Sequence, residues 1–343
     1  MSLITLRNGQ QVGDYHRPYI VAELNTSHFG DVVIAKRMID QAKAAGCDCV
    51  KFQSWAAESL YCDSYYQANK VAKRMVTKFA LNDDKLRELS GYAREKGIEF
   101  ASTPYSIEEA IFLVKECGVP FLKVASMDLN NVSYLTELAQ LHLPLVLSTG
   151  MGTLEEIREA VRTIEAAGNR QLIILHCTSV YPADPEIIRL RNIEGLRGEF
   201  RDYPIGYSDH SVGIEIPSAS VALGACLIEK HFTLDKSRIG MDNQMATEPA
   251  EMEAMVKACH RVYDAMGGTG RLLCDKELGQ ISRMRRSIVS KITLLPGDIL
   301  TESNIEFKRP GTGIAPSNYK KVINREVTKR IEAGSVITDN DLL

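Results

Sequence analysis

Short apolar runs alternate with longer amphipathic segments between Tyr19 and Met266. Runs of consecutive apolar residues are typical of strands buried on both faces, whereas apolar residues spaced three or four positions apart predict helices. The expected strands are 19–22, 49–52, 99–101, 121–124, 144–147, 172–175, 204–207 and 227–228. The expected helices are 32–45, 83–96, 107–117, 134–141, 154–167, 185–196, 216–223 and 249–266.

Eight strand–helix units in about 250 residues predict an α/β fold, the (β/α)8 TIM barrel. An open doubly wound sheet is the structural alternative, but it usually begins with a glycine-rich phosphate-binding turn. The first turn here, residues 23–28, contains no glycine. Residues 4–10, with an Asn-Gly turn, predict a small hairpin before the barrel. Residues 55–81 predict a long loop with its own helix over the barrel mouth.

The pattern changes after Met266. A glycine-rich run ends the last helix, and the charged stretch up to Arg286 predicts a linker. The remaining residues form short β runs and turns, in which LPGDILT at 295–301 is echoed by EAGSVIT at 332–338. This weak repeat predicts a small pseudo-symmetric β-rich domain, whose thin core favours packing on a partner. The expected organisation is therefore a barrel domain 1–270, a linker 271–286 and a β-rich domain 287–343.

Composition narrows the possible partners. The net charge of −3 gives no general preference for nucleic acid or for an anionic membrane. There is no apolar run of transmembrane length, and we expect no signal peptide. The eight cysteines form no C-x-x-C pair. We therefore expect free thiols in a reducing cytoplasm, without a zinc cluster, and neither nucleic-acid nor membrane binding.

The stretch 205–232 places polar residues where a buried strand should not have them. Residues 208–210 follow one apolar run, and Glu229 and His231 lie at the end of the next. Because strand side chains alternate between two faces, Glu229 and His231 point the same way, which is inward in a closed barrel. Buried carboxylates and imidazoles are costly unless they are paired or bind a metal, so they predict an active site at the C-terminal face of the barrel.

Polar side chains also follow the other predicted strands. They are Glu23, Lys51, Gln53, Thr103, Lys123, Ser126, Asp128, Ser148, His176, Thr178, Ser179, Tyr181, Ser208 and His210. A single histidine at a strand end is usually structural, and a single lysine usually extends its charged head into water. Together, however, two lysines with several hydroxyls predict a phosphate or carboxylate site, and two histidines on adjacent strands predict a divalent-metal site. The set predicts a metal-assisted enzyme acting on a phosphorylated anion.

An ordered series of motifs resembles one known family. The motifs are AEL at 22–24, SH-x-G at 27–30, VKFQ at 50–53, STP at 102–104, LKVAS at 122–126, LSTGM at 147–151, LHCTS-x-YP at 175–182, YSDHS at 207–211 and IEKHFTLDK at 228–236. They resemble the sialic acid synthase family, the bacterial nonulosonate synthases. KRPGTGI at 308–314 resembles the antifreeze-like (SAF) domain of that family. The resemblance covers nearly the whole chain.

The resemblance implies a specific reaction. Members of the family condense phosphoenolpyruvate with an open-chain N-acyl hexosamine, giving a nine-carbon 2-keto acid and phosphate. C3 of the enolpyruvate attacks the aldehyde, water adds at C2, and the resulting intermediate loses phosphate by C–O cleavage. By resemblance His210 and His231 bind a divalent metal, with Mn²⁺ expected and Mg²⁺ or Co²⁺ as alternatives.

The remaining roles also follow from the resemblance. The expected ligands of phosphoenolpyruvate are Lys51, Gln53, Thr103, Lys123, Ser126, Ser148, Ser179 and Ser208. Glu23, Glu229 and Asp128 are the expected catalytic carboxylates. Tyr181, Asp242 and Arg309 are expected to contact the sugar, Arg309 from the other subunit of a homodimer with swapped SAF domains.

Three departures from the family pattern concern the aldehyde side of the pocket. Ser126-Met127-Asp128 stands where the family usually has S-x-E, residues 240–245 replace a G-P-D-H-like motif, and Ser27 replaces the usual Asn. Ser179 also stands where many relatives have Asn. We therefore expect N-acetylmannosamine to be a poor acceptor, and a modified or deoxygenated hexosamine to react at least about tenfold better.

Three other functions are compatible with the strand-end residues. A 3-deoxy-ulosonate phosphate synthase would use the same donor with a phosphorylated aldose, but it has no reason to contain the C-terminal tail. A Schiff-base aldolase would use Lys51 or Lys123, and borohydride would trap it with pyruvate. A non-catalytic sugar-binding barrel would not need the paired carboxylates, lysines and histidines.

Overall fold

The computed structural model describes residues 2–343 and divides the chain into two compact units. The first unit ends at Gly267, and the second spans Gly268–Leu343. The division falls in the glycine-rich run that ends the last barrel helix. None of the helices in residues 2–343 is long and apolar enough to cross a membrane.

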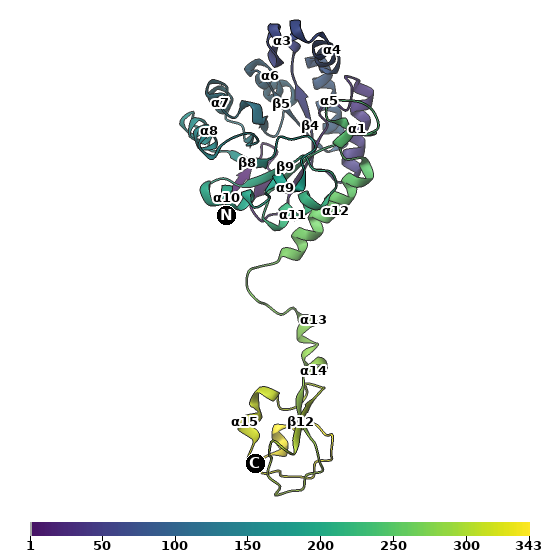
Figure 1. Ribbon diagram of the computed structural model, residues 1–343, viewed down its shortest axis with the longest axis vertical. Helices are drawn as coiled ribbons and strands as arrows, with labels where there is room; N and C mark the ends of the chain where they lie inside the picture. Colours follow the sequence, from purple (N-terminus) through teal and green to yellow (C-terminus); the bar gives the residue numbers. More distant parts are fainter. Residues whose placement is uncertain (1) are drawn as a thin grey trace. The chain divides into compact units, whose positions relative to one another are not determined.

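The first unit contains the predicted parallel barrel (Figure 1). Its strands are β3 (Tyr19–Glu23), β4 (Cys49–Ser54), β5 (Glu99–Pro104), β6 (Leu122–Val124), β7 (Leu145–Ser148), β8 (Leu172–Cys177), β9 (Ile205–Asp209) and β10 (Leu227–His231). Parallel ladders join them in the order β5-β4-β3-β10-β9-β8-β7-β6. The two ends of this order, β5 and β6, lie side by side, so the sheet curves into a TIM-like barrel. This confirms the predicted fold class.

Helices follow the strands as the sequence predicts. They are α1 (Val32–Ala44), α5 (Asp83–Lys96), α6 (Ile107–Phe112) with the π-turn η1 (Leu113–Cys117), α7 (Val132–Ala139), α8 (Leu154–Ala166), α9 (Pro185–Ile188), α10 (Asn192–Glu199), α11 (Glu215–Ala222) and α12 (Pro249–Met266). The single helix expected over 185–196 is wrong. Arg189 adopts a left-handed conformation with φ of 50°, which ends α9 and separates it from α10.

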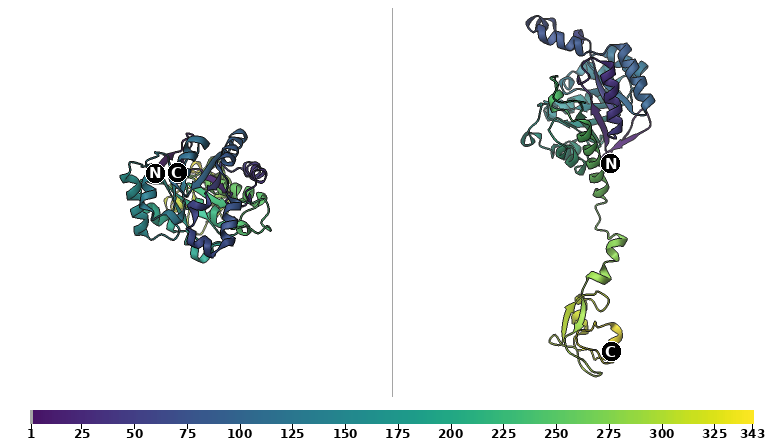
Figure 2. Two further views of the ribbon diagram at one scale, coloured as in Figure 1. Left: turned by 90° about the horizontal axis from the view of Figure 1, so that it is seen from above. Right: turned by 90° about the vertical axis from the view of Figure 1, so that its right-hand side faces the viewer.

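The long loop after β4 contains three helices rather than one. These are α2 (Ala57–Leu60), α3 (Asp63–Ala68) and α4 (Lys70–Phe79). Asn69 separates the last two, because its side chain accepts a hydrogen bond from the Ala72 amide and caps the start of α4. Figure 2 shows these blue helices projecting from the end of the barrel that lies away from the N-terminus.

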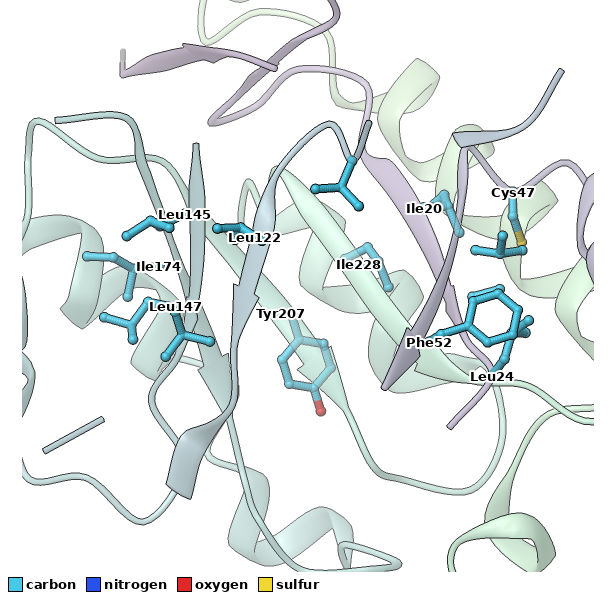
Figure 3. Close-up of a cluster of buried hydrophobic side chains, with 14 of the residues drawn as sticks. Ile20, Leu24, Cys47, Phe52, Leu122, Leu145, Leu147, Ile174, Tyr207 and Ile228 are labelled. Atoms are coloured by element: carbon cyan, nitrogen blue, oxygen red, sulfur yellow. The ribbon is translucent and has the colours of Figure 1, made fainter. Parts of the chain in front are cut away.

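The barrel core has an outer and an inner layer, because side chains alternate along each strand. Outward residues such as Ile20, Phe52, Ile174 and Ile228 are buried against the helices (Figure 3). Inward residues fill the barrel as an apolar plug, made of Tyr19, Val21, Cys49, Ala101, Phe121, Val146, Ile173, Leu175 and Leu227.

The N-terminal hairpin packs on this plug. Its strands, β1 (Leu3–Thr5) and β2 (Gln11–Gly13), pair antiparallel, as the sequence predicts. Leu6 and Val12 are buried with the inner residues of the barrel. The hairpin therefore covers the N-terminal end of the barrel, so the barrel interior opens towards solvent at the C-terminal ends of the strands.

The second unit is small and β-rich. It contains α13 (Asp275–Leu278), α14 (Ile281–Met284), β11 (Ser287–Ser290), β12 (Ile305–Lys308) and α15 (Tyr319–Val322). The repeated phrases occupy matching positions. Gly297 and Gly334 both have positive φ, and their amides donate to the carbonyls of Val327 and Ser290, respectively. This pairing supports the pseudo-symmetry expected from the sequence repeat.

Candidate active site

A cavity of about 350 Å³ opens at the C-terminal ends of the barrel strands. All the predicted site residues except Asp128 and Arg309 line it. These lining residues are Glu23, Lys51, Gln53, Thr103, Lys123, Ser126, Ser148, Ser179, Tyr181, Ser208, His210, Glu229, His231 and Asp242. The structure thus brings together side chains from all eight strands and the loops that follow them.

Strand alternation explains this convergence. Glu23, Lys51, Thr103, Lys123, Ser148 and Glu229 each lie two positions after an apolar residue of the plug. Ser208 lies two positions after Gly206, where an added Cβ would come within 2.5 Å of the Leu175 side chain. The inward-facing side chains of the strands therefore change from apolar to polar at the same level of the barrel interior.

We call the buried polar layer of the cavity the floor. It consists of Glu23, Lys51, Thr103, Lys123, Ser148, Ser208, His210, Glu229 and His231. None of these residues is more than 7% exposed. Buried polar groups need partners, and those of the floor are mostly one another.

Two lysines and two glutamates form the centre of the floor. Lys51 is ion-paired with Glu23 and lies 3.8 Å from Glu229, and Lys123 lies 3.9 Å from the other oxygen of Glu229. Hydroxyls complete the network. Lys51 donates to Thr103 at 3.0 Å, and Lys123 donates to Ser148 at 2.6 Å. The ammonium groups are therefore held in place before any substrate binds.

The two carboxylates differ in proton affinity. Burial raises the pKa of Glu23 to about 7, and the neighbouring Lys51 offsets this only in part. Burial also acts to raise the pKa of Glu229, but Lys123 and Lys51 outweigh it and hold that pKa below its usual value. Near neutral pH, Glu229 is ionised while Glu23 exchanges a proton readily, which is the pattern of an acid–base pair with divided roles.

The two histidines of the floor fit a divalent-metal site. Their ring centroids are 5.4 Å apart. His210 Nδ1 donates to the Thr178 carbonyl at 2.8 Å, which leaves Nε2 free to bind a ligand. Burial lowers the pKa of His231 well below its usual value, so its ring is neutral and can coordinate a metal. Within residues 2–343 no three His, Cys, Asp or Glu side chains form a metal cluster, so water or substrate would supply the other ligands.

Cys177 is a cavity residue that the sequence analysis missed. Its thiol lies 3.7 Å from Ser126 Oγ and 3.9 Å from His210 Nδ1. The neighbouring His176 points outward instead, with Nε2 donating to the Ile188 carbonyl and its ring stacked on Tyr207. The alternation of side chains along β8 could have identified it, because Cys177 lies two positions after Leu175, a residue of the apolar plug.

Gly150 lets the loops after β6, β7 and β8 meet closely. An added Cβ there would lie 2.1 Å from Ser179 Oγ and 2.8 Å from Ser126 Oγ. Its amide donates to Ser126 Oγ at 3.1 Å. Any larger residue at this position would displace two of the hydroxyls expected to bind phosphoenolpyruvate.

We call the exposed side chains around the opening the rim. The rim consists of Tyr61, Met127, Met151, Tyr181 and Met241, which are 38–73% exposed. Tyr181 links rim to floor, because its ring lies 4.2 Å from that of His210. Apart from Tyr181, no rim residue was among the predicted site residues, because methionines and a single tyrosine at loop positions have no catalytic signal in the sequence.

Two predicted site residues lie elsewhere. Asp128 ends the 3₁₀ turn η2 (Ser126–Asp128), where its neighbour Met127 lines the cavity and its own Oδ1 accepts from Asn131 at 3.4 Å. Asp128 is therefore not among the residues that line the cavity. Within residues 2–343, however, its Oδ2 is buried without a hydrogen-bond partner, and its charge acts on Tyr105 of the lining, so its catalytic role stays a prediction. Arg309 lies in the second unit, just after β12.

Comparisons with known proteins agree with this architecture. Residues 38–271 match the NeuB family, and residues 285–343 match the SAF domain. The chain is 36% identical to the N,N'-diacetyllegionaminic acid synthase of Legionella pneumophila, covering 93% of both chains. It is 34% identical to the human N-acetylneuraminate-9-phosphate synthase, over 96% of this chain and 94% of that one. A crystal structure of the N-acetylneuraminic acid synthetase of Leptospira borgpetersenii superposes with a TM-score of 0.75 and 34% identity, covering 82% of this chain and 95% of that chain.

Proposed function

For this chain, which belongs to the NeuB family, we propose the condensation of phosphoenolpyruvate with an N-acyl hexosamine, giving a nine-carbon 2-keto sugar acid and phosphate. The floor is the observation that supports this proposal most strongly. Two buried lysines with adjacent hydroxyls match an anion that has both a phosphate and a carboxylate. Beside them, the paired glutamates and the two imidazoles supply acid–base and metal-binding groups.

The donor binds at the floor. Lys51 and Lys123 hold the phosphate and carboxylate of phosphoenolpyruvate, with Thr103 and Ser148 donating further hydrogen bonds. The remaining expected donor contacts, Gln53, Ser126, Ser179 and Ser208, line the same cavity. Because these groups are already positioned, little ordering is needed when the donor binds.

The two glutamates of the floor supply the base and balance the charge of the lysines. In the proposed mechanism Glu23 accepts a proton from the water that adds at C2, since its pKa of about 7 suits a base at neutral pH. Glu229 stays ionised, accepts from Ser208 at 3.0 Å and balances the lysine charges. The phosphate then leaves by C–O cleavage, with its charge stabilised by Lys51 and Lys123.

His210 and His231 would hold a divalent cation, which would polarise the aldehyde oxygen and help to orient the attacking water. We expect Mn²⁺, with Mg²⁺ or Co²⁺ as alternatives. The neutral His231 ring and the free Nε2 of His210 support this assignment. We also place the protein in the cytoplasm, where its eight free cysteines would stay reduced.

The assembly is part of the proposal. We expect a homodimer in which Arg309 of each SAF domain reaches the acceptor in the other subunit. The small core of the second unit supports such packing on a partner. Mixing inactive Arg309→Ala chains with inactive His231→Ala chains under exchange conditions should restore up to about a quarter of the activity, because half of the dimers would have one intact site. A fully active monomer would contradict this part of the proposal.

A phosphate-release assay tests the proposed reaction. The protein, phosphoenolpyruvate and Mn²⁺ are incubated with a panel of N-acyl hexosamines and phosphorylated aldoses. We expect release only when donor and hexosamine are both present, and no release from a folded Lys123→Met variant. Release with phosphorylated aldoses alone would favour the 3-deoxy-ulosonate phosphate synthase. Absence of release with every acceptor would contradict the proposed function.

A further inference from the structure

A second polar level lies above the floor on one side of the barrel. The strands β3, β4 and β5 are neighbours in the sheet, and each supplies one floor residue from its C-terminal end. Two positions after those floor residues, Glu23, Lys51 and Thr103, the chain has Asn25, Gln53 and Tyr105. All three line the cavity, as the alternation of side chains requires. We call Asn25, Gln53 and Tyr105 the arc.

Hydrogen bonds join the arc to Glu23. The Glu23 Oε1 atom accepts from the backbone N–H of Asn25 at 3.0 Å and from Gln53 Nε2 at 3.2 Å. Its Oε2 atom contacts the ammonium of Lys51 and accepts no further hydrogen bond from residues 2–343. Each carboxylate oxygen has two lone pairs. The arc therefore occupies both lone pairs of Oε1, whereas Oε2 keeps one that can take a proton.

Tyr105 sets the orientation of the Gln53 amide. Its hydroxyl donates to Gln53 Oε1 at 3.2 Å, so the opposite end of the amide, Nε2, faces Glu23. Burial raises the pKa of Tyr105 well above its usual value, and the charge of Glu23 adds to this rise, so the hydroxyl stays protonated and remains a donor. A turned amide would place its oxygen against the Glu23 carboxylate, with two acceptors facing each other.

The Tyr105 side chain is fixed independently of Gln53. Its backbone N–H donates to Glu109 Oε2 at 2.7 Å, at the start of α6. Its ring packs edge-on against that of Trp55, with centroids 5.9 Å apart. Trp55 in turn donates from Nε1 to the carbonyl of Val76, in α4, at 3.3 Å. The hydroxyl is therefore placed by α6 and the long loop after β4, and it constrains Gln53 rather than following it.

Asn25 holds the other side of Glu23. Its φ of 39° lies in the left-handed region, which asparagine adopts more readily than most residues. In this conformation its backbone N–H points back to Glu23, while its side-chain Nδ2 donates to the carboxylate of Asp242. The turn after β3 is thus fastened to a distant loop, which keeps the Asn25 N–H on Glu23 Oε1.

From this arrangement we propose that Tyr105 is a positioning residue, which acts through Gln53 to make Oε2 of Glu23 the atom that accepts the proton. This inference rests on the proposed function, in which Glu23 is the base. As the water oxygen bonds to C2 of the donor, its O–H bond breaks and the proton moves to Oε2. A carboxylate that is already held in one orientation needs no rearrangement during this step.

Removing one oxygen atom tests the role of Tyr105. At saturating phosphoenolpyruvate, Mn²⁺ and the best hexosamine of the panel, Tyr105→Phe should lower kcat about tenfold and change the KM for phosphoenolpyruvate by less than about twofold. Calorimetric titration with phosphoenolpyruvate should give the wild-type stoichiometry, which excludes a loss of folded sites. Tyr203→Phe is the control, because it removes the hydroxyl of a buried tyrosine that donates to Glu165 at 2.6 Å outside the cavity lining. It should keep the wild-type kcat.

A double-mutant cycle tests whether Tyr105 acts through Gln53. In a Gln53→Met background, Tyr105→Phe should lower kcat by less than about twofold more, since the link to Glu23 is already absent. An equal tenfold loss in both backgrounds would overturn the inference, as would a loss confined to the KM for phosphoenolpyruvate. An active wild type with unchanged kcat in Tyr105→Phe would also overturn it, but would leave the proposed function intact. A wild type that releases no phosphate with any acceptor would overturn both.

Discussion

The floor and the rim of the cavity are built in opposite ways. Floor side chains are at most 7% exposed, and most of them are fixed by ion pairs or hydrogen bonds to one another, whereas rim side chains are 38–73% exposed and mostly apolar. Except for His210, which directly follows β9, the floor lies on the barrel strands, and the rim lies on the loops that follow them. In the proposed function, donor chemistry and acceptor choice therefore depend on separate layers, so that one can vary without the other.

Metal removal should lower the rate of phosphate release most, because in the proposed function every active site needs the divalent cation held by the two histidines of the floor. EDTA should abolish phosphate release, and Mn²⁺ should restore it. A His231→Ala variant should stay inactive at any metal concentration, whereas His16→Gln, an exposed histidine, should behave like the wild type. Full activity in metal-free protein would remove the histidines from the proposed mechanism.

Replacing an inward lysine should cost activity, and replacing an outward lysine should cost stability. Lys123→Met is expected to lower kcat/KM by about 10³-fold, because in the proposed function it removes a charge that faces the donor phosphate. Lys230 points the other way and pairs with the buried Asp209 at 2.5 Å. Lys230→Met should lower the free energy of unfolding by about 3 kcal/mol, since it leaves the buried carboxylate of Asp209 without its ion-pair partner.

Denaturant unfolding and steady-state kinetics on the two lysine variants distinguish these effects. Folded Lys230→Met protein should keep a kcat/KM within a few-fold of the wild type. If it lost as much activity as Lys123→Met, the distinction between inward lysines needed for activity and outward lysines needed for stability would be wrong.

The strand alternation made most of the floor predictable. Because apolar residues recur at every second position and then give way to polar ones, Lys51, Lys123 and Glu229 could be assigned to one cavity before any coordinates were known. The same alternation identifies Cys177 as an inward side chain and the adjacent His176 as an outward one. Composition alone does not reveal which face a strand-end residue occupies, but its distance from the apolar plug does.

The rim and the loop geometry could not be predicted in the same way. Whether Met127 or Asp128 enters the cavity depends on the 3₁₀ turn after β6, and no periodicity specifies that turn. The break between α9 and α10 depends on one left-handed residue, Arg189, which has no sequence signal of its own. Loops follow local hydrogen bonds and packing, so their side chains require a structure.

The pH dependence of the reaction should report on Glu23. Because the pKa of its carboxyl is about 7, the fraction able to accept a proton falls as the pH drops below that value. With saturating Mn²⁺, kcat/KM should fall about tenfold per pH unit below about pH 7. Glu23→Gln should be nearly inactive and lack this dependence. A flat profile between about pH 8 and 5.5 would exclude Glu23 as the base.

Rim substitutions should have the smallest effect on the KM for phosphoenolpyruvate. Met151→Ala shortens the most exposed rim side chain, at 73%, and should change the KM for phosphoenolpyruvate by less than about twofold. The KM for the acceptor should change more, because in the proposed function that side chain faces the sugar. A larger change in the KM for phosphoenolpyruvate than in the KM for the acceptor would mean that the rim and the floor do not bind different substrates.

Binding of phosphoenolpyruvate without any acceptor tests the division most directly. Isothermal titration calorimetry with Mn²⁺ present would compare the wild type, the floor variant Lys123→Met and the rim variant Met241→Lys, after each is shown to be folded. The account predicts a Kd for Met241→Lys within about threefold of the wild type, and at least about 100-fold weaker binding for Lys123→Met. Equal loss in both variants, or unchanged binding by Lys123→Met, would contradict the claim that the floor alone holds the donor.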